Sequence, residues 1–281
     1  MCRILAVSTS GHIPEEYAFS FKELADVGRT IYGTKAETER RGKPTGHRGG
    51  WGLAISREGT WLGEPLLSDV DRDPGMGDAS ARDSGYAEAL NSCDLSGPGV
   101  LISHLRRPSS GQVCNRNTHP FRQGKYVFCH NGAISWLAQE DRSAPSEGLR
   151  NDSRAFFNRI LTRLSGGSSA EQSLFDTCAE IHKEDLRVPM PERYTSLTCA
   201  LSDGQTLWVV RDVNPAQEAA GERYFTMYLA RTDPRSPTAV ACQEPISVAS
   251  SGTLGAWESL GTRELVSIRN GTVVNRTKLP S

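Results

Sequence analysis

The second residue of the chain is a cysteine, directly after the initiator methionine in "MCRILAVS". Cysteine is small enough for methionine aminopeptidases to remove Met1, which would leave one residue carrying both a thiol and a free α-amino group. An α-amine with an ordinary pKa of about 7.7 to 8.0 is substantially unprotonated at neutral pH and can serve as the base for the thiol beside it. Cys2 is therefore a candidate N-terminal nucleophile. The alternative is a small apolar residue that begins a buried strand.

A second polar group lies at residues 130–132, which read His-Asn-Gly. Asn-Gly is the commonest dipeptide of a tight hairpin turn, and this is one interpretation of Asn131-Gly132. In the other, the Asn131 side-chain amide and the Gly132 backbone N–H point at one oxygen. Two such donors form an oxyanion hole, which stabilises the tetrahedral intermediate of acyl transfer.

Polar side chains are also dense in residues 103–121, at the end of an apolar segment. Most arginines are solvated surface charges, but at a strand end Arg106 or Arg107 can bind a carboxylate through two parallel hydrogen bonds. We expect His104 to be a structural histidine with satisfied hydrogen bonds rather than a base. Asp152 begins a predicted helix, where the helix dipole alone favours an acidic residue.

The hydrophobic pattern predicts the elements that position these residues. Strands are expected within 2–8, 50–67 (two, joined around Glu58 and Gly59), 99–107, 124–134, 196–213, 223–232, 246–252 and 264–275, and helices at 152–167 and 169–186. Residues 68–99 are rich in Asp, Gly, Ser and Pro, and predict a surface excursion with a short helix at 86–92. Strands, then helices, then strands again predict a single α+β domain, residues 2–281, in which helices cover antiparallel sheets.

Composition excludes several classes of partner. The formal net charge is -1, and no run of five or more like charges occurs, so we expect no nucleic-acid or membrane partner. The apolar run Ile4 to Val7 is too short for a signal-peptide core, which predicts a cytoplasmic protein. Seven cysteines without any CxxC motif predict reduced thiols and no zinc site.

The motifs together carry a resemblance. In chain order they are Cys2, "HRGGWG" at 47–52, "HLRRPSSG" at 104–111, "NTHPF" at 117–121, "HNGAI" at 130–134 and "DS" at 152–153. This set resembles the class II glutamine amidotransferase domain of the N-terminal nucleophile hydrolases, in its stand-alone form. The resemblance implies a four-layer α/β/β/α sandwich of two antiparallel sheets, with no cofactor and no metal.

The resemblance also implies roles for individual residues. Cys2 would attack the γ-carboxamide carbon of glutamine or of a γ-glutamyl compound, with its own α-amino group moving protons. Asn131 and Gly132 would hold the oxyanion. Arg106 would bind the α-carboxylate of the substrate, and Asp152 its α-ammonium group.

The remaining substrate-binding residues implied in this way are His130, Trp51 and Gly50, with residues 47–51 forming the loop beside the nucleophile. Three departures from the family pattern concern the outer half of the substrate. Gly49 stands where related proteins commonly have aspartate, Arg154 replaces a usual acidic residue, and Arg107-Pro108 replaces an aromatic or small pair.

The sequence thus predicts hydrolysis of a γ-glutamyl amide through a thioester on Cys2. We expect no synthase segment after the domain, so the enzyme either acts for its own sake or passes ammonia to a separate synthase. The rival interpretation is a catalytically silent binding module with the same fold, which would need none of the five residues Cys2, Arg106, Asn131, Gly132 and Asp152.

Overall fold

The computed structural model describes residues 2–43, 45–47, 49–68, 84–107, 114–190, 192–216, 223–232, 237–247 and 255–279. Within them the chain forms two antiparallel sheets. The first contains β12 (Glu258–Ser259), β10 (Tyr228–Arg231), β11 (Thr238–Cys242), β1 (Arg3–Thr9), β5 (Gly99–Leu105), β2 (Trp51–Arg57) and β3 (Thr60–Trp61) in that order, with β4 (Leu66–Leu67) also paired to β2. The second contains β14 (Thr272–Lys278), β13 (Glu264–Arg269), β9 (Thr206–Arg211), β8 (Thr198–Ser202), β7 (Tyr126–Asn131) and β6 (Phe121–Gln123).

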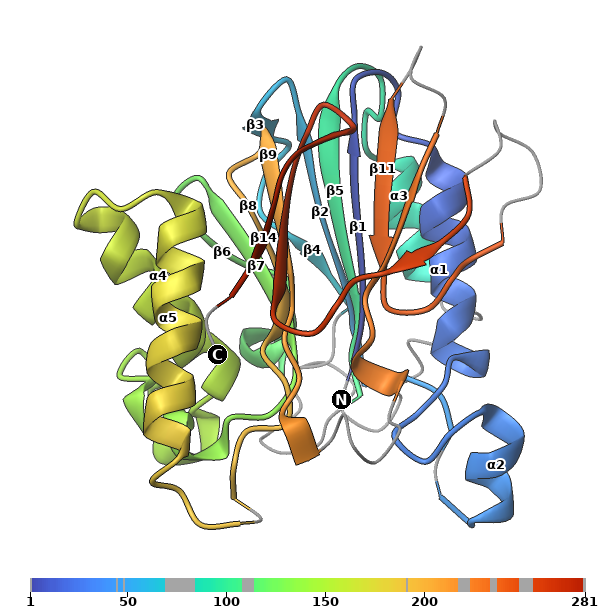
Figure 1. Ribbon diagram of the computed structural model, residues 1–281. Coiled ribbons are helices and arrows are strands. Elements are labelled where there is room, and N and C mark those ends of the chain that lie inside the picture. Colours follow the sequence, from blue (N-terminus) through green and yellow to red (C-terminus); the bar gives the residue numbers. More distant parts are fainter. Residues whose placement is uncertain are drawn as a thin grey trace.

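Helices cover the outer face of each sheet (Figure 1). The first sheet carries α1 (Glu15–Val27) and α3 (Ser84–Asn91), and the second carries α4 (Asp152–Ser165) and α5 (Ala170–Asp185). The short α2 (Lys35–Arg40) lies near one end of α1, and four 3₁₀ helices, η1 (Asn115–Asn117), η2 (Ser135–Glu140), η3 (Glu147–Leu149) and η4 (Arg223–Phe225), complete the set. The predicted four-layer α/β/β/α sandwich is confirmed.

Alternation along the strands divides the core into layers. On β1, Leu5 and Val7 pack against the helices of the first sheet, whereas Ile4 and Ala6 pack against the second sheet. Successive strand residues face opposite sides of a sheet, so one strand serves both cores. The face of β1 that carries Ile4 is therefore the face between the two sheets, and its lower end in Figure 1 is where the chain begins.

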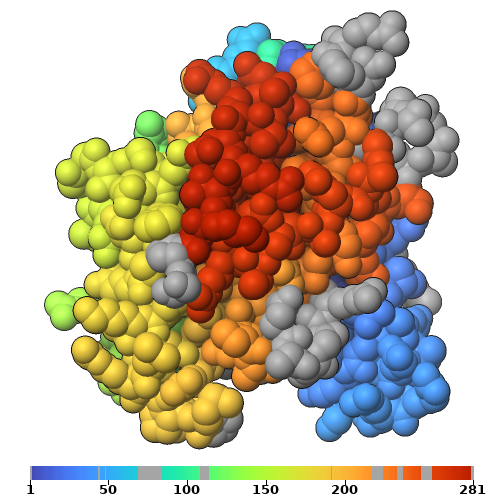
Figure 2. Space-filling model, viewed as in Figure 1, coloured from blue at the N-terminus to red at the C-terminus, as the bar shows by residue number. Residues whose placement is uncertain are grey.

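The two predicted central helices form where expected because their ends are capped. The Asn151 side chain accepts from the Arg154 N–H at 3.0 Å, and the Ser169 hydroxyl accepts from the Gln172 N–H at 3.1 Å. Such caps satisfy backbone donors that a helix start otherwise leaves unpaired. Figure 2 shows the C-terminal β13–β14 hairpin in red, on the visible face of the molecule next to α5.

The structure differs from the sequence expectation in a few elements. Helix α1, helix α2 and strand β11 were not among the expected elements. Residues 246–247 are not in a strand, and the rest of the strand expected there lies outside the described residues. Part of the expected excursion is helix α3, whose Tyr86 and Leu90 are buried in the core, while residues 69–83 lie outside the described part. None of the described helices is long and apolar enough to cross a membrane.

Candidate active site

Cys2 precedes β1 directly, and its main chain is bound to the end of β7 in the other sheet. The Cys2 N–H donates to Asn131 Oδ1 at 2.8 Å, and Asn131 Nδ2 donates to the Cys2 carbonyl at 2.8 Å. The buried Asn131 Nδ2 also donates to Gln243 Oε1 at 3.0 Å. The predicted nucleophile and the predicted oxyanion donor are thus brought together across the two sheets. Both amide hydrogens of Asn131 are used in this arrangement.

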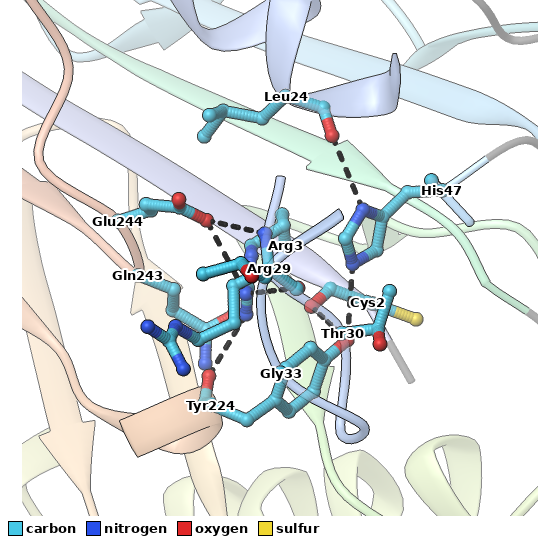
Figure 3. A network of polar contacts seen from close by, with 12 residues as sticks. Cys2, Arg3, Leu24, Arg29, Thr30, Gly33, His47, Tyr224, Gln243 and Glu244 are labelled. Carbon is cyan, nitrogen blue, oxygen red and sulfur yellow. Dashed lines mark hydrogen bonds and ion pairs between the residues drawn. The ribbon is translucent and has the colours of Figure 1, made fainter. Parts of the chain in front are cut away.

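Tyr224 and His47 hold the Cys2 carbonyl from the other side (Figure 3). The Tyr224 hydroxyl donates to this carbonyl at 2.9 Å and lies 3.1 Å from His47 Nε2, while His47 Nδ1 lies 3.2 Å from the Leu24 carbonyl. Burial, and next the charge of Arg3, lower the pKa of His47 well below its ordinary value, so the ring is neutral. A neutral ring that donates to Leu24 accepts at Nε2. The single Tyr224 hydroxyl proton is then shared between His47 and the Cys2 carbonyl.

Arg3 forms the base of this network. Its Nη1 donates to the Tyr224 carbonyl at 2.8 Å, and the guanidinium lies 4.1 Å from the centre of the Tyr224 ring. Nη2 donates to the Arg29 carbonyl and lies 3.4 Å from Glu244 Oε2. Because Arg3 is buried, these contacts replace its lost hydration and fix the residue next to Cys2.

The strand register places the thiol beside two side chains of β5. In the β1–β5 pairing, Arg3 is opposite Leu105 and Ile4 is opposite His104. Side chains of alternate residues share a face, so Cys2, His104 and Arg106 all belong to the face between the sheets. The sulfur takes no part in the contacts drawn in Figure 3, which bind only the backbone of Cys2.

The electrostatic surroundings favour the thiolate. Burial by itself raises the pKa of the Cys2 thiol, but His104 and then the positive amino terminus outweigh it and lower the pKa to about 6. Burial lowers the pKa of Arg106, and the negative charge on Cys2 counters that shift, so the guanidinium lies within electrostatic reach of the thiolate. A cysteine with this pKa is largely ionised at neutral pH, the form in which it is a nucleophile.

His104 differs from the expected structural histidine because it acts on the thiol. It is fully buried, and its ring has no hydrogen-bond partner among the described residues other than the Cys2 thiol, whose pKa it lowers. Its ring lies 4.4 Å from that of His119, whose pKa burial lowers well below the ordinary value. The buried imidazole thus faces the thiol and favours its thiolate form.

Gly132 is held where no side chain fits. A Cβ atom on it would lie 1.9 Å from the Ser196 carbonyl oxygen and 2.7 Å from His130 Nε2. His130 itself is buried, with Nδ1 2.9 Å from the Ser153 hydroxyl and Nε2 2.9 Å from the Ser196 carbonyl. Both of its ring nitrogens are engaged by the protein, so His130 supports the Gly132 segment, and the expected contact of His130 with substrate stays a prediction.

The loop before β2 is attached to the backbone of Arg106. The Arg106 N–H donates to the Gly50 carbonyl at 2.8 Å, and the Gly49 N–H donates to the Arg106 carbonyl at 2.8 Å. Gly50 has a φ of 118°, a conformation that residues with a side chain rarely adopt. The predicted loop therefore does lie beside the predicted carboxylate-binding arginine, and Gly50 is required for its path.

The side chain of Trp51 lies on the outer face of β2. Its side chain packs in the outer core, edge-to-face with Tyr86 at 5.3 Å, and the Trp51 backbone N–H donates to the Ser68 hydroxyl at 2.9 Å. Trp51 is opposite Leu105 in the sheet, and both face the helical layer. The indole thus faces away from Cys2, and the expectation that residues 47–51 lend backbone groups to the pocket stays a prediction.

Asp152 is half-buried at the start of α4. Its Oδ2 accepts from the Ile134 N–H at 2.7 Å, and its Oδ1 accepts from the Ser153 N–H at 2.9 Å. These bonds attach the start of α4 to the segment after Gly132. A carboxylate oxygen accepts more than one hydrogen bond, so the position remains compatible with the expected contact to an α-ammonium group.

The two unusual arginines lie near the site. Arg154 Nη2 donates to the Arg116 carbonyl at 2.6 Å, its guanidinium lies 4.1 Å from the centre of the Phe121 ring, and burial lowers its pKa to about 10. Arg107 Nη1 donates to the Gly46 carbonyl at 3.3 Å. Among the described residues no group of three or more His, Cys, Asp and Glu side chains is arranged to hold a metal ion.

Comparison with known protein families identifies the family of this chain. The family model "Glutamine amidotransferases class-II" matches residues 1–280. The chain belongs to the class-II glutamine amidotransferase family. It is 24% identical over 170 residues to YafJ of Escherichia coli (strain K12), an alignment that covers 59% of this chain and 56% of that relative.

Solved structures share the fold of this class-II amidotransferase. A glutamine aminotransferase class-II domain protein from Silicibacter pomeroyi matches with a TM-score of 0.55 and 16% identity, over 100% of both chains. The glutamine phosphoribosylpyrophosphate amidotransferase of B. subtilis, complexed with ADP and GMP, matches with a TM-score of 0.58 and 11% identity. That match covers 99% of this chain and 49% of the other, so this chain corresponds to about half of that enzyme.

Sequence reasoning found part of the amidotransferase site. The structure brings Cys2, Asn131 and Arg106 together, and attaches Gly132 and Asp152 to neighbouring segments. The residues that sequence reasoning missed are Tyr224, Gln243 and Arg3, which hold the main chain at Cys2 directly, through Asn131 or through one another. His47 was expected in the loop beside the nucleophile and contacts Tyr224. His47 and His104 belong to the sequence motifs HRGGWG and HLRRPSSG. Tyr224 and Gln243 belong to no recognised motif, so the sequence carried no signal for them.

Proposed function

We propose that this class-II amidotransferase hydrolyses the γ-amide of glutamine or of a γ-glutamyl compound through a thioester on Cys2. The family assignment supports glutamine amide hydrolysis in general. The observation that carries the proposal is geometric: Cys2 stands at the start of β1, its main chain is bonded to Asn131, and it shares a strand face with His104 and Arg106. His104 also lowers the pKa of the thiol.

In the first step the Cys2 thiolate attacks the γ-carboxamide carbon. The carbonyl π electrons move to oxygen, and the resulting oxyanion is held by the Gly132 N–H and by Asn131 Nδ2. Because Nδ2 donates to Gln243 in this arrangement, it exchanges that bond for the oxyanion. The exchange takes place only as negative charge develops, so it favours the transition state over the ground state.

The substrate's head group is held at its two charges. Arg106, two residues beyond His104 and on the same face, binds the α-carboxylate, and Asp152 accepts from the α-ammonium group. A charge-assisted pair of this kind contributes about 1.5 to 3 kcal/mol per hydrogen bond. Every γ-glutamyl compound carries both groups, so this half of the site recognises the class rather than one member.

The second half of the reaction releases the amine and restores the enzyme. Collapse of the tetrahedral intermediate breaks the C–N bond, and the leaving nitrogen takes a proton from the α-amino group of Cys2, exposed by loss of Met1. Water then attacks the thioester, the same amine accepts its proton, and glutamate leaves with regeneration of the thiolate. Arg107 and Arg154 lie on the side proposed for the leaving group.

A glutaminase that supplies ammonia to a separate synthase is the second candidate. It is favoured by the likeness to the B. subtilis amidotransferase, of which this chain covers 49%. Both candidates share the chemistry at Cys2 and differ in the fate of ammonia. A binding module that only keeps the fold is disfavoured by the unusual thiol.

The test is a screen for glutamate released from glutamine and from several γ-glutamyl amides, run with the parent protein and with Cys2→Ala. We expect release by the parent, none by the variant, and a mass of the purified parent that lacks Met1. A glutamine-mimicking electrophile should label Cys2 and not the buried Cys129. Full activity in Cys2→Ala, or retention of Met1 in an active protein, would refute the proposal.

A further inference from the structure

A cavity of about 620 Å³ lies at the C-terminal end of α5, among residues with no part in the proposed reaction. Its wall includes His182 and Leu186, then Met190 and Tyr194 from the segment after α5, and Asn214 from the segment after β9. The volume lies in the range of about 300 to 1,000 Å³ that is common for small-molecule sites. This end of α5 is at the lower left of the molecule in Figures 1 and 2.

The cavity has an apolar side that faces solvent. Leu186 is 71% exposed and Met190 is 62% exposed. Pro215 and Ala216 also contribute to its wall. Large apolar side chains exposed to water at the mouth of a cavity are unfavourable. Their free energy falls when an apolar part of a ligand covers them.

The charged residues of the wall are mostly cations. Lys183, Arg193 and Arg263 line the cavity, against one carboxylate, that of Asp185. The carboxylate in the wall, Asp185, already accepts from the Trp136 indole N–H at 3.1 Å and from the Tyr194 N–H at 2.8 Å. The unneutralised charge of the wall is therefore positive.

Polar groups on the inner side of the cavity are buried or held by contacts with the protein. His182 Nε2 lies 2.7 Å from Asp212 Oδ2, and Asp212 is fully buried. Asp212 Oδ1 has no hydrogen-bond partner among the described residues. Burial, and then the Asp212 carboxylate, raise the pKa of Tyr194, so its hydroxyl stays protonated. Arg193 is oriented by a bond from Nε to the Val188 carbonyl at 3.0 Å.

We propose that this cavity is a second ligand site that binds a small organic anion with an apolar body. The anionic group faces Lys183, Arg193 and Arg263, and the apolar body covers Leu186 and Met190. Charge complementarity selects the anion, and the exposed apolar rim selects a body larger than a simple inorganic ion. The site is independent of the chemistry at Cys2.

The experiment compares two fluorescent probes with one ring system, anilinonaphthalene sulfonate and its uncharged analogue phenylnaphthylamine, on the folded protein. We expect saturable binding of one equivalent of the sulfonate, and an affinity at least about tenfold weaker for the uncharged analogue. Met190→Glu should weaken the sulfonate about tenfold or more, because it removes apolar contact and adds a like charge. Lys183→Gln should reduce the preference for the sulfonate over the analogue.

Two variants serve as controls. Val274→Glu introduces the same charge at another exposed apolar residue, 59% exposed on β14, and should change the affinity less than about twofold. Cys2→Ala should bind the sulfonate as the parent does, which separates this test from the proposed glutaminase activity. Equal affinity for both probes, unchanged binding by Met190→Glu, or loss of binding in Cys2→Ala would overturn the proposal. A parent dimer that Met190→Glu converts to monomer would also overturn it, in favour of a second copy covering the cavity.

Discussion

Replacing His104 with glutamine tests the origin of the nucleophile's reactivity. The substitution keeps a polar side chain of similar length but removes the imidazole that lowers the thiol pKa. The pKa of the Cys2 thiol is about 6 in this site, against 9.0 for an unperturbed thiol. At pH 7 these two values correspond to about 90% and about 1% thiolate. Complete loss of the lowering would therefore reduce the reactivity of Cys2 at pH 7 by up to about ninetyfold.

The expected loss is smaller than this limit, because the amino terminus also lowers the pKa while burial raises it. We expect the His104→Gln thiol to titrate at least one pH unit higher, with alkylation at pH 7 slowed about tenfold or more. The assay is the rate of carboxamidomethylation of Cys2 by iodoacetamide between about pH 5 and about pH 9, followed by mass spectrometry of the N-terminal peptide. It needs no substrate, so it reports on the thiol alone.

His119→Gln is the matched control, since His119 is also buried and lies 4.4 Å from His104, ring to ring, but is not among the groups that shift the thiol pKa. The pH midpoint of Cys2 alkylation in His119→Gln should equal that of the parent protein. An unchanged midpoint in His104→Gln would refute the assignment of His104. An equal rise in both variants would mean that disturbed packing, and not the His104 imidazole, changes the thiol.

Three further outcomes follow from the same geometry. Gly132→Ala should lower turnover by at least about a hundredfold, because its Cβ meets the Ser196 carbonyl at 1.9 Å and displaces an oxyanion donor; an unaltered kcat would contradict this. Tyr224→Phe should lose one hydrogen bond to the Cys2 carbonyl, destabilising the fold by about 0.5 to 1.5 kcal/mol in urea titration, while full stability with full activity would remove Tyr224 from the site. The pKa of His119 is lowered in the folded protein, so the unfolded chain binds more protons below about pH 6.5 and stability falls as the pH falls through that value. His119→Gln should flatten the dependence of melting temperature on pH in this range, and an identical slope would show that other groups cause it.

The sequence was sufficient for the parts of the fold whose signal is local. The helices α4 and α5 follow from capping residues and from an apolar stripe that needs no distant partner. Strand β1 and strand β5 are short apolar runs bounded by turn residues. Helix α1 was not predicted, although its buried face includes Tyr17, Phe21 and Leu24. Strand β11 is completed by pairing with β1, a partner that lies more than two hundred residues away in the chain.

The sequence by itself determined which side chains are candidates for chemistry. A cysteine at position 2, an Asn-Gly pair, an arginine at a strand end and an aspartate at a helix start are residue types whose reactivity belongs to the side chains themselves. The tertiary structure decided which of them act on one another. Cys2 meets Asn131 across 129 residues and Tyr224 across 222, contacts that exist only because two separate sheets pack face to face. The same packing buried His104 beside the thiol and left the Trp51 side chain on the opposite face. The alternation of a strand assigns each side chain to one face of the sheet, but only the packing of the layers decides what that face contacts.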